Sequence, residues 1–110
     1  MTGLAAAWQL LRANRPVTLA LFESAMAAGP ASGQMWQRLV ADTAMLRDHL
    51  EYSRDRGGQL PGEPTLVAAT MGAVLVTLAY ALPTDGSATP DDEVVDTLTR
   101  LFLHGLAGQA

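Results

Sequence analysis

Residues 64–82 read PTLVAATMGAVLVTLAYAL and contain no charged side chain. From Leu66 to Leu82 the stretch is apolar apart from two threonines and one glycine. It is at the short end of the ~20 residues that span a bilayer, and no basic residue flanks it as an anchor. We therefore expect a fully buried helix and no membrane association. A helix that is apolar on all sides needs packing partners on more than one face.

The composition of the whole chain agrees with a helical fold. Its 110 residues suffice for a single domain, 1–110, with its own core. Alanine and leucine dominate, isoleucine is absent and aromatic residues make up only 5%. Strands prefer β-branched and aromatic residues, so this balance predicts an all-α protein. The absence of cysteine excludes disulfides and thiolate zinc sites and fits a reducing, cytoplasmic location.

Proline and glycine divide the chain into five expected helices. They are predicted at about residues 4–14, 16–28, 32–56, 64–82 and 90–106. The third and longest has Ser32 as a plausible N-cap and Gly57-Gly58 as its stop. The last begins with Thr89 as N-cap and Pro90 at the first helical position, followed by acidic residues that favour a helix N-terminus.

The charged residues exclude several classes of function. The net charge is −4 and all seven basic residues are arginine, with no basic face. Nucleic-acid binding by this chain alone is therefore disfavoured. The two histidines lack a patterned third metal ligand, and the glycine-rich segment 57–62 lacks the Lys-Ser/Thr of a phosphate-binding loop. No acid/base pair or nucleophile can be assembled from the helical spacing, so we expect no enzyme activity, no metal and no cofactor.

The last two expected helices carry more apolar surface than a small monomer needs. This surplus favours a homodimer in which both helices meet their copies in a four-helix bundle. The alternative, that both helices are central in the monomer, stays open. The candidate dimer-interface residues are Ala69, Ala73, Thr77, Val94, Leu98, Leu101 and Phe102.

A small-molecule pocket is expected where large, adaptable side chains converge, because methionine suits apolar recognition and bundle pockets form between helices. His49 belongs to a half-polar stripe that could orient a ligand. For these residues the alternatives are core packing and a solvent-facing boundary. The candidate ligand-binding residues are Trp8, Phe22, Met26, Trp36, Met45, His49 and Met71.

The ending DEVVDTLTRLFLHGL, residues 92–106, resembles the final helix of TetR-family transcriptional regulators. Arg15-Pro16, the segment RGGQL at 56–60 and the segment PTLVAA at 64–69 are similar to other parts of that family. The resemblance covers the C-terminal ligand-binding and dimerisation region only. It implies a five-helix bundle that dimerises through its last two helices and holds a small-molecule pocket among the earlier ones.

The family's basic helix-turn-helix region has no counterpart in these residues, so the resemblance implies DNA binding only through such a region. We therefore expect an effector-sensing and dimerisation domain that binds a small apolar or amphipathic molecule. The alternative is a stand-alone helical interaction module that forms mixed dimers with a full-length regulator.

Overall fold

The computed structural model describes residues 3–85, 87 and 89–105. Every regular element in this part of the chain is helical, which confirms the all-α prediction. Six α-helices and one short 3-10 helix replace the five expected helices. They are α1 (Gly3–Ala13), α2 (Arg15–Ala27), η1 (Pro30–Ser32), α3 (Gln34–Asp42), α4 (Ala44–Asp55), α5 (Pro64–Ala81) and α6 (Asp91–His104).

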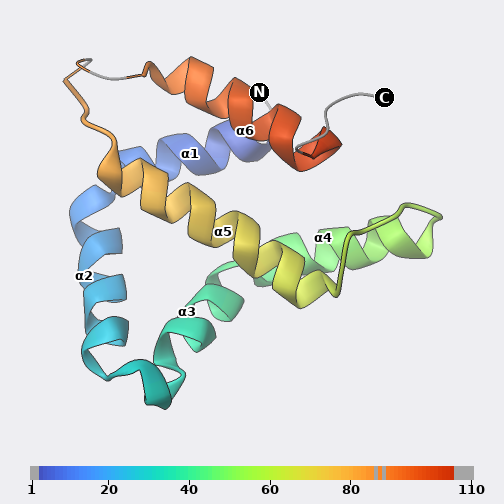
Figure 1. Ribbon diagram of the computed structural model, residues 1–110, viewed down its shortest axis with the longest axis horizontal. Coiled ribbons are helices and arrows are strands. Elements are labelled where there is room, and N and C mark those ends of the chain that lie inside the picture. The colour runs from blue at the N-terminus through green and yellow to red at the C-terminus, as the bar shows by residue number, and fades with distance from the viewer. Residues whose placement is uncertain (1–2, 86, 88, 106–110) are drawn as a thin grey trace.

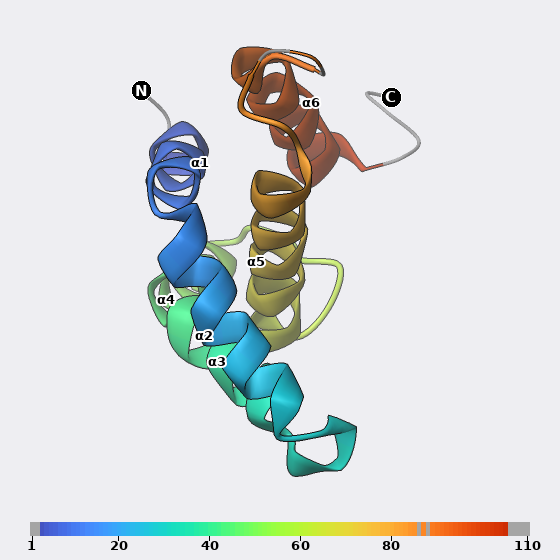
Figure 2. The same ribbon diagram turned by 90° about the vertical axis from the view of Figure 1, so that its left-hand side faces the viewer.

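Helix α5 is the element around which the others are arranged (Figure 1). Helices α1, α3 and α4 pack directly against it. Figure 2 shows α1 to α4 on one side of α5, while α6 lies beyond the C-terminal end of α5 and beside α1. The turn between α2 and α3 is at the opposite end of the molecule from α1 and α6, so the molecule has a core end and a turn end.

The core joins the first helix to the last two. Trp8 of α1 is 0% exposed and packs in one cluster with Leu75 and Ala79 of α5 and with Val94 and Leu98 of α6. Half-buried leucines and valines from the same three helices surround this cluster. The indole of Trp8 is the largest fully buried side chain, so the core end of the molecule is built around it.

The prediction of one long helix over residues 32–56 is wrong. The segment is divided at Thr43 into two helices, α3 and α4. Thr43 has φ −109° and ψ 13°, outside helical geometry. It is both the C-cap of α3 and the N-cap of α4. Its hydroxyl donates a hydrogen bond to the Leu39 carbonyl at 2.6 Å. Such a bond to the preceding turn often bends a helix, although the Thr70 and Thr99 hydroxyls make the same bond inside the continuous helices α5 and α6. The apolar periodicity continues across the break, which is why the sequence pattern hides it.

Gly72 of α5 lies directly against this break. A Cβ atom at Gly72 would overlap the Thr43 methyl group. Threonine is stiff about χ1, and its hydroxyl is already committed to Leu39, so the methyl cannot easily move. The Thr43 methyl group therefore occupies the space that a side chain at Gly72 would need. This contact sets how α3 and α4 cross α5.

This fit gives a prediction for a double-mutant cycle. Gly72→Ala should destabilise the wild-type chain by about 1 kcal/mol, because overpacking outweighs the gain in helix propensity. In a Thr43→Ser background, which removes the methyl and keeps the hydroxyl, the same change should stabilise by up to about 1 kcal/mol. Urea denaturation of the four proteins measures both values. An equal effect of Gly72→Ala in both backgrounds would contradict the contact.

Two helix starts also differ from the expectation. The N-cap of α3 is Gly33 and not Ser32, which belongs to η1, although the Ser32 hydroxyl still accepts a hydrogen bond from the Gln34 amide at 3.2 Å. The N-cap of α6 is Pro90 and not Thr89, so the proline precedes the helix instead of opening it. The predicted end of the last helix at residue 106 lies outside the described residues.

A side chain that the sequence reading missed caps α5. The carboxylate of Glu63 accepts hydrogen bonds from the amides of Thr65 and Leu66, each at 3.1 Å. These two bonds favour the charged form and lower the pKa of Glu63. The capping carboxylate and Pro64 at the first position fix where the central helix begins.

Candidate functional site

The turn end of the molecule contains an open pocket between α2 and α3. Gly29 (φ 93°) and Gly33 (φ 74°) are on either side of η1 and adopt left-handed backbone conformations that favour glycine. The pocket has a volume of about 490 Å³ and is open to solvent on one side. We call it the α2–α3 pocket. It is lined by Ala25, Met26, Gly29, Pro30, Gly33, Met35 and Trp36.

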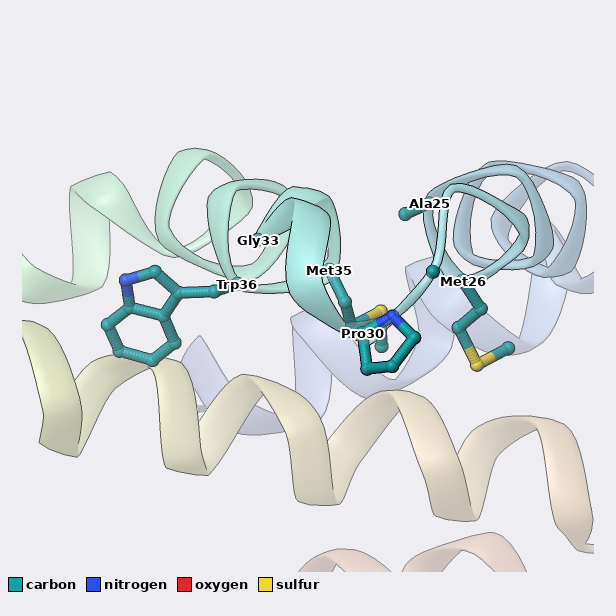
Figure 3. A pocket seen from close by; sticks show the side chains of 7 residues that line it. Ala25, Met26, Pro30, Gly33, Met35 and Trp36 are labelled. Atoms are coloured by element: carbon teal, nitrogen blue, oxygen red, sulfur yellow. The ribbon is translucent and has the colours of Figure 1, made fainter.

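The side chains of the α2–α3 pocket are apolar. Figure 3 shows the Trp36 ring extending away from Met26, with Pro30 and Met35 between them in this view. Trp36 remains 46% exposed, so part of its ring is accessible. Among the lining residues there is no carboxylate, histidine or basic side chain. The pocket can therefore hold apolar or aromatic groups, but it offers no charged partner.

The structure brings together two of the seven sequence-predicted ligand residues, Met26 and Trp36. Trp8 and Phe22 are buried, Trp8 in the core described above. Met45 is 87% exposed and His49 is also exposed, both on α4. None of these four lines the α2–α3 pocket.

Met71, the last of the predicted ligand residues, is half-buried on α5 and does not line the pocket either. Sequence reasoning missed Met35, Pro30 and the two glycines. The signal that could have found them is the Gly-Pro-Ala-Ser-Gly turn at residues 29–33, directly between two methionine-bearing helix ends.

Helix α5 presents an uncharged outer surface, and the expectation that this helix is fully buried is wrong. Only 33% of its 18 residues are buried. Within the described residues it is the one helix long and apolar enough to cross a membrane by length and composition, a test that core helices of soluble proteins also pass. Residues spaced by four, three, four and three positions form its outward stripe, which we call the α5 face. They are Leu66, Thr70, Ala73, Thr77 and Tyr80.

Some of the predicted dimer-interface residues are accessible at the protein surface, and others are buried inside the protomer. Ala73 is half-buried and Thr77 exposed, both on the α5 face. Ala69, Val94 and Leu98 are buried inside the protomer. Leu101 and Phe102 are partly buried against the same core. In this protomer, therefore, Thr77 is the exposed residue of the predicted interface, and Ala73, Leu101 and Phe102 are partly accessible.

The outer side of α6 differs from the α5 face in its polarity. Its exposed residues include Asp92, Glu93, Asp96 and Arg100, and the last two form an ion pair at 2.7 Å. A surface with this many charges is typical of a solvated helix face. The uncharged surface suited to helix packing is thus on α5.

The protomer exposes more surface than its mass predicts. Its accessible area is 7335 Å², whereas a monomer of 11.6 kDa is expected to expose about 5,800 Å². The difference is about twice the ~800 Å² that each partner buries in a standard protein interface. The radius of gyration, 14.8 Å, likewise exceeds the ~13 Å of a compact domain of this length. The protomer is therefore more extended than a compact monomer of the same mass.

Two arginines at the junction of α1 and α2 hold the C-terminal end of α5. The guanidinium of Arg12 donates to the carbonyls of Ala79 at 2.9 Å and Leu82 at 2.6 Å. It also forms an ion pair with Asp91 at 3.1 Å. The guanidinium of Arg15 donates to the Tyr80 carbonyl and lies 5.7 Å above the centre of the Tyr80 ring. The junction thereby fixes one end of the α5 face.

Comparison with known proteins identifies no relative of this chain. No family model, curated protein or solved structure matches the chain. The resemblance to the TetR family therefore depends on the quoted residues alone.

The described part of the chain offers no site for catalysis by a metal. No group of three or more histidine, aspartate or glutamate side chains is close enough there to hold a metal ion. Asp91, Asp92 and Glu93 are consecutive at the start of α6, where acidic groups compensate the helix dipole.

Proposed function

We propose that this chain is an effector-sensing and dimerisation domain of the kind found at the C-terminus of TetR-like transcriptional regulators. The observation that carries the proposal is the α5 face, an uncharged helix surface left open in a protomer with surplus accessible area. The α2–α3 pocket supports the sensing half of the proposal. The residue pattern of the last helix supports the family.

The spacing of the α5 face fits pairing with a second copy. Leu66 and Tyr80 are each seven residues, about two helical turns, from Ala73. In an antiparallel pair centred on Ala73, Leu66 of one protomer lies beside Tyr80 of its partner, and Thr70 lies near the partner's Thr77. The small side chains at the centre let the two helices approach closely, and the large ones fill the ends. The stripe is thus self-complementary about a two-fold axis.

Sensing would work through differential affinity. An effector bound between α2 and α3 favours one arrangement of these helices over another. Because α3 packs against α5, and α5 forms the pairing surface, that preference reaches the geometry of the dimer. In a protein with DNA-reading regions, the spacing between them would change accordingly.

A second function is favoured by the same surface. The α5 face could pair with a different chain, so that the protein forms mixed dimers with a full-length regulator. The uncharged stripe and the surplus area support this reading as well. The two functions differ in whether the purified chain pairs with itself.

Sedimentation equilibrium over a wide range of protein concentrations tests the proposal. We expect a dimer, and we expect Thr77→Glu to weaken it about 100-fold or more, because burying an unpaired carboxylate costs several kcal/mol. Thr97→Glu makes the same chemical change on the exposed side of α6 and should leave the dimer intact. A monomer at every concentration would contradict self-pairing and favour the mixed dimer. Equal disruption by both variants would contradict pairing through α5.

A further inference from the structure

We infer that Arg15 determines the direction in which two copies of this chain pair through α5. It holds the Tyr80 ring in place for the partner's Leu66 and attracts the partner's Glu63, so that the two α5 helices run antiparallel. This inference rests on the proposed dimerisation and deepens it, because it names the residues that select the partner and its orientation. The occupant of the α5 face is then a second copy of the chain.

Tyr80 is the aromatic side chain of the α5 face, and the α1–α2 junction holds it from one side (Figure 1). The Arg15 guanidinium donates to the Tyr80 carbonyl and lies 5.7 Å from the centre of its ring. The ring nevertheless remains 48% exposed, so part of it is accessible to a partner. Tyrosine is frequent among the residues that dominate binding at interfaces, and a side chain that is already ordered loses less conformational entropy on binding. Tyr80 is therefore suited to anchor the pairing.

Opposite charges flank the uncharged α5 face at its two ends. Arg15 is half-buried at the C-terminal end of α5, and Glu63 is exposed at the N-terminal end, where it caps the helix. Among the described residues, neither group forms an ion pair. Arg54 contributes to the lowered pKa of Glu63, but less than the capping hydrogen bonds do. Each end of the face thus carries a charge that a partner of opposite charge can compensate.

Antiparallel pairing brings these two charges together. In a pair centred on Ala73, two positions lie side by side when they are equally far from Ala73 in opposite directions. Glu63 is ten residues before Ala73, so the partner's Glu63 comes level with Pro83, ten residues after it. Pro83 is three residues, about 4.5 Å along a helix axis, beyond Tyr80. The Tyr80 carbonyl points toward that end and holds Arg15 there, so the partner's Glu63 meets the guanidinium at both ends of the dimer.

Parallel pairing would place like charges together instead. Arg15 would lie at the same end as the partner's Arg15, and Glu63 at the same end as the partner's Glu63. Like charges that face each other across an interface are strongly unfavourable and reject the wrong arrangement. Two parallel helix dipoles side by side would add to this repulsion. The charges at the ends of the α5 face therefore select the antiparallel pair.

Exchanging the two charges within one chain tests the inference. Arg15→Glu and Glu63→Arg each create like-charge contacts at both ends of an antiparallel homodimer, and we expect each to weaken the dimer about tenfold or more. The double variant restores opposite charges at both ends and should dimerise at least about tenfold more tightly than either single variant. The two positions are at opposite ends of an 18-residue helix, about 27 Å apart, so they do not compensate each other within one protomer. Sedimentation equilibrium of the full-length chains measures all four dimers.

Helix α4 provides a matched control. Its Tyr52 is 61% exposed, and the Arg56 guanidinium lies 5.3 Å from the centre of the Tyr52 ring. Tyr80→Ala should weaken the dimer about tenfold, whereas Tyr52→Ala and Arg56→Glu should not change it. Arg15→Lys keeps the charge and should weaken the dimer less than Arg15→Glu does. Far-UV circular dichroism confirms that each variant is folded.

The possible outcomes separate this inference from the proposed dimerisation. A dimer that Thr77→Glu disrupts, but that both charge variants leave intact, keeps the association function and overturns the inference. A double variant that dimerises no more tightly than the single variants contradicts antiparallel pairing and also overturns it. Equal effects of the α4 variants and the Arg15 and Tyr80 variants would have the same meaning. A wild-type chain that is monomeric at every concentration overturns both the inference and self-pairing.

Discussion

Replacing Trp8 with alanine is expected to lower the free energy of unfolding by about 3–5 kcal/mol, the cost of removing a large aromatic side chain from a packed core. Trp8 is 0% exposed and contacts residues of α5 and α6. A domain of this size is stabilised by only about 5–15 kcal/mol, so the substitution removes much of the total. Urea denaturation followed by circular dichroism measures the loss.

The second tryptophan provides the matched control. Trp36→Ala makes the same chemical change at a position that is 46% exposed, and it should cost less than about 1 kcal/mol. Trp8→Phe should fall between the two, because it keeps most of the volume and removes an indole N–H that has no hydrogen-bond partner. A similar loss for Trp8→Ala and Trp36→Ala would contradict the placement of Trp8 at the centre of the core.

Replacing Arg12 with alanine is expected to destabilise the protein by about 3 kcal/mol, because several charge-assisted hydrogen bonds are lost at once. The Arg12 side chain is only 8% exposed. Its guanidinium donates to the Ala79 and Leu82 carbonyls at the C-terminal end of α5, and it extends to the Pro83 carbonyl at 3.0 Å. Thermal and urea denaturation measure the loss.

Two further variants separate the carbonyl contacts of Arg12 from its ion pair. Asp91→Asn should cost less than about 1 kcal/mol, since the Asp91 side chain is 34% exposed and the pair is partly screened. Arg12→Lys should recover only a small part of the loss, because a point charge cannot replace the planar fork. If Asp91→Asn is as damaging as Arg12→Ala, the ion pair and not the capping of α5 is the main contribution.

The sequence predicted the fold class for a simple physical reason. Alanine and leucine favour helices, and proline and glycine mark the helix ends, so the all-α fold and the bounds of α5 follow closely from the pattern. The break at Thr43 does not follow from it. The apolar period runs through both helices, and the break lies where the Thr43 hydroxyl bonds to the Leu39 carbonyl and its methyl group packs on Gly72. Tertiary contacts of this kind leave no trace in the periodicity.

The candidate site could be predicted only in part. Met26 and Trp36 were identified by residue type, and the structure brings them together. Residue type alone cannot distinguish Trp36 from Trp8, because either ring suits a core or a pocket. The burial of α5 within one protomer was overestimated, because apolar composition does not tell which face of a helix its own chain covers. In the structure the outer stripe of that helix remains open.

The pairing of α1 with α6 has a consequence for the order in which the protein folds during synthesis. Trp8 leaves the ribosome well before its partners Val94 and Leu98, which follow it by more than 80 residues. At rates of about 5–20 residues per second, the nascent chain displays the uncovered indole and the apolar α5 for several seconds. Release of α6 closes the core. Chaperones that bind exposed apolar segments therefore have their opportunity before that step, and removal of α6 would make that exposure permanent.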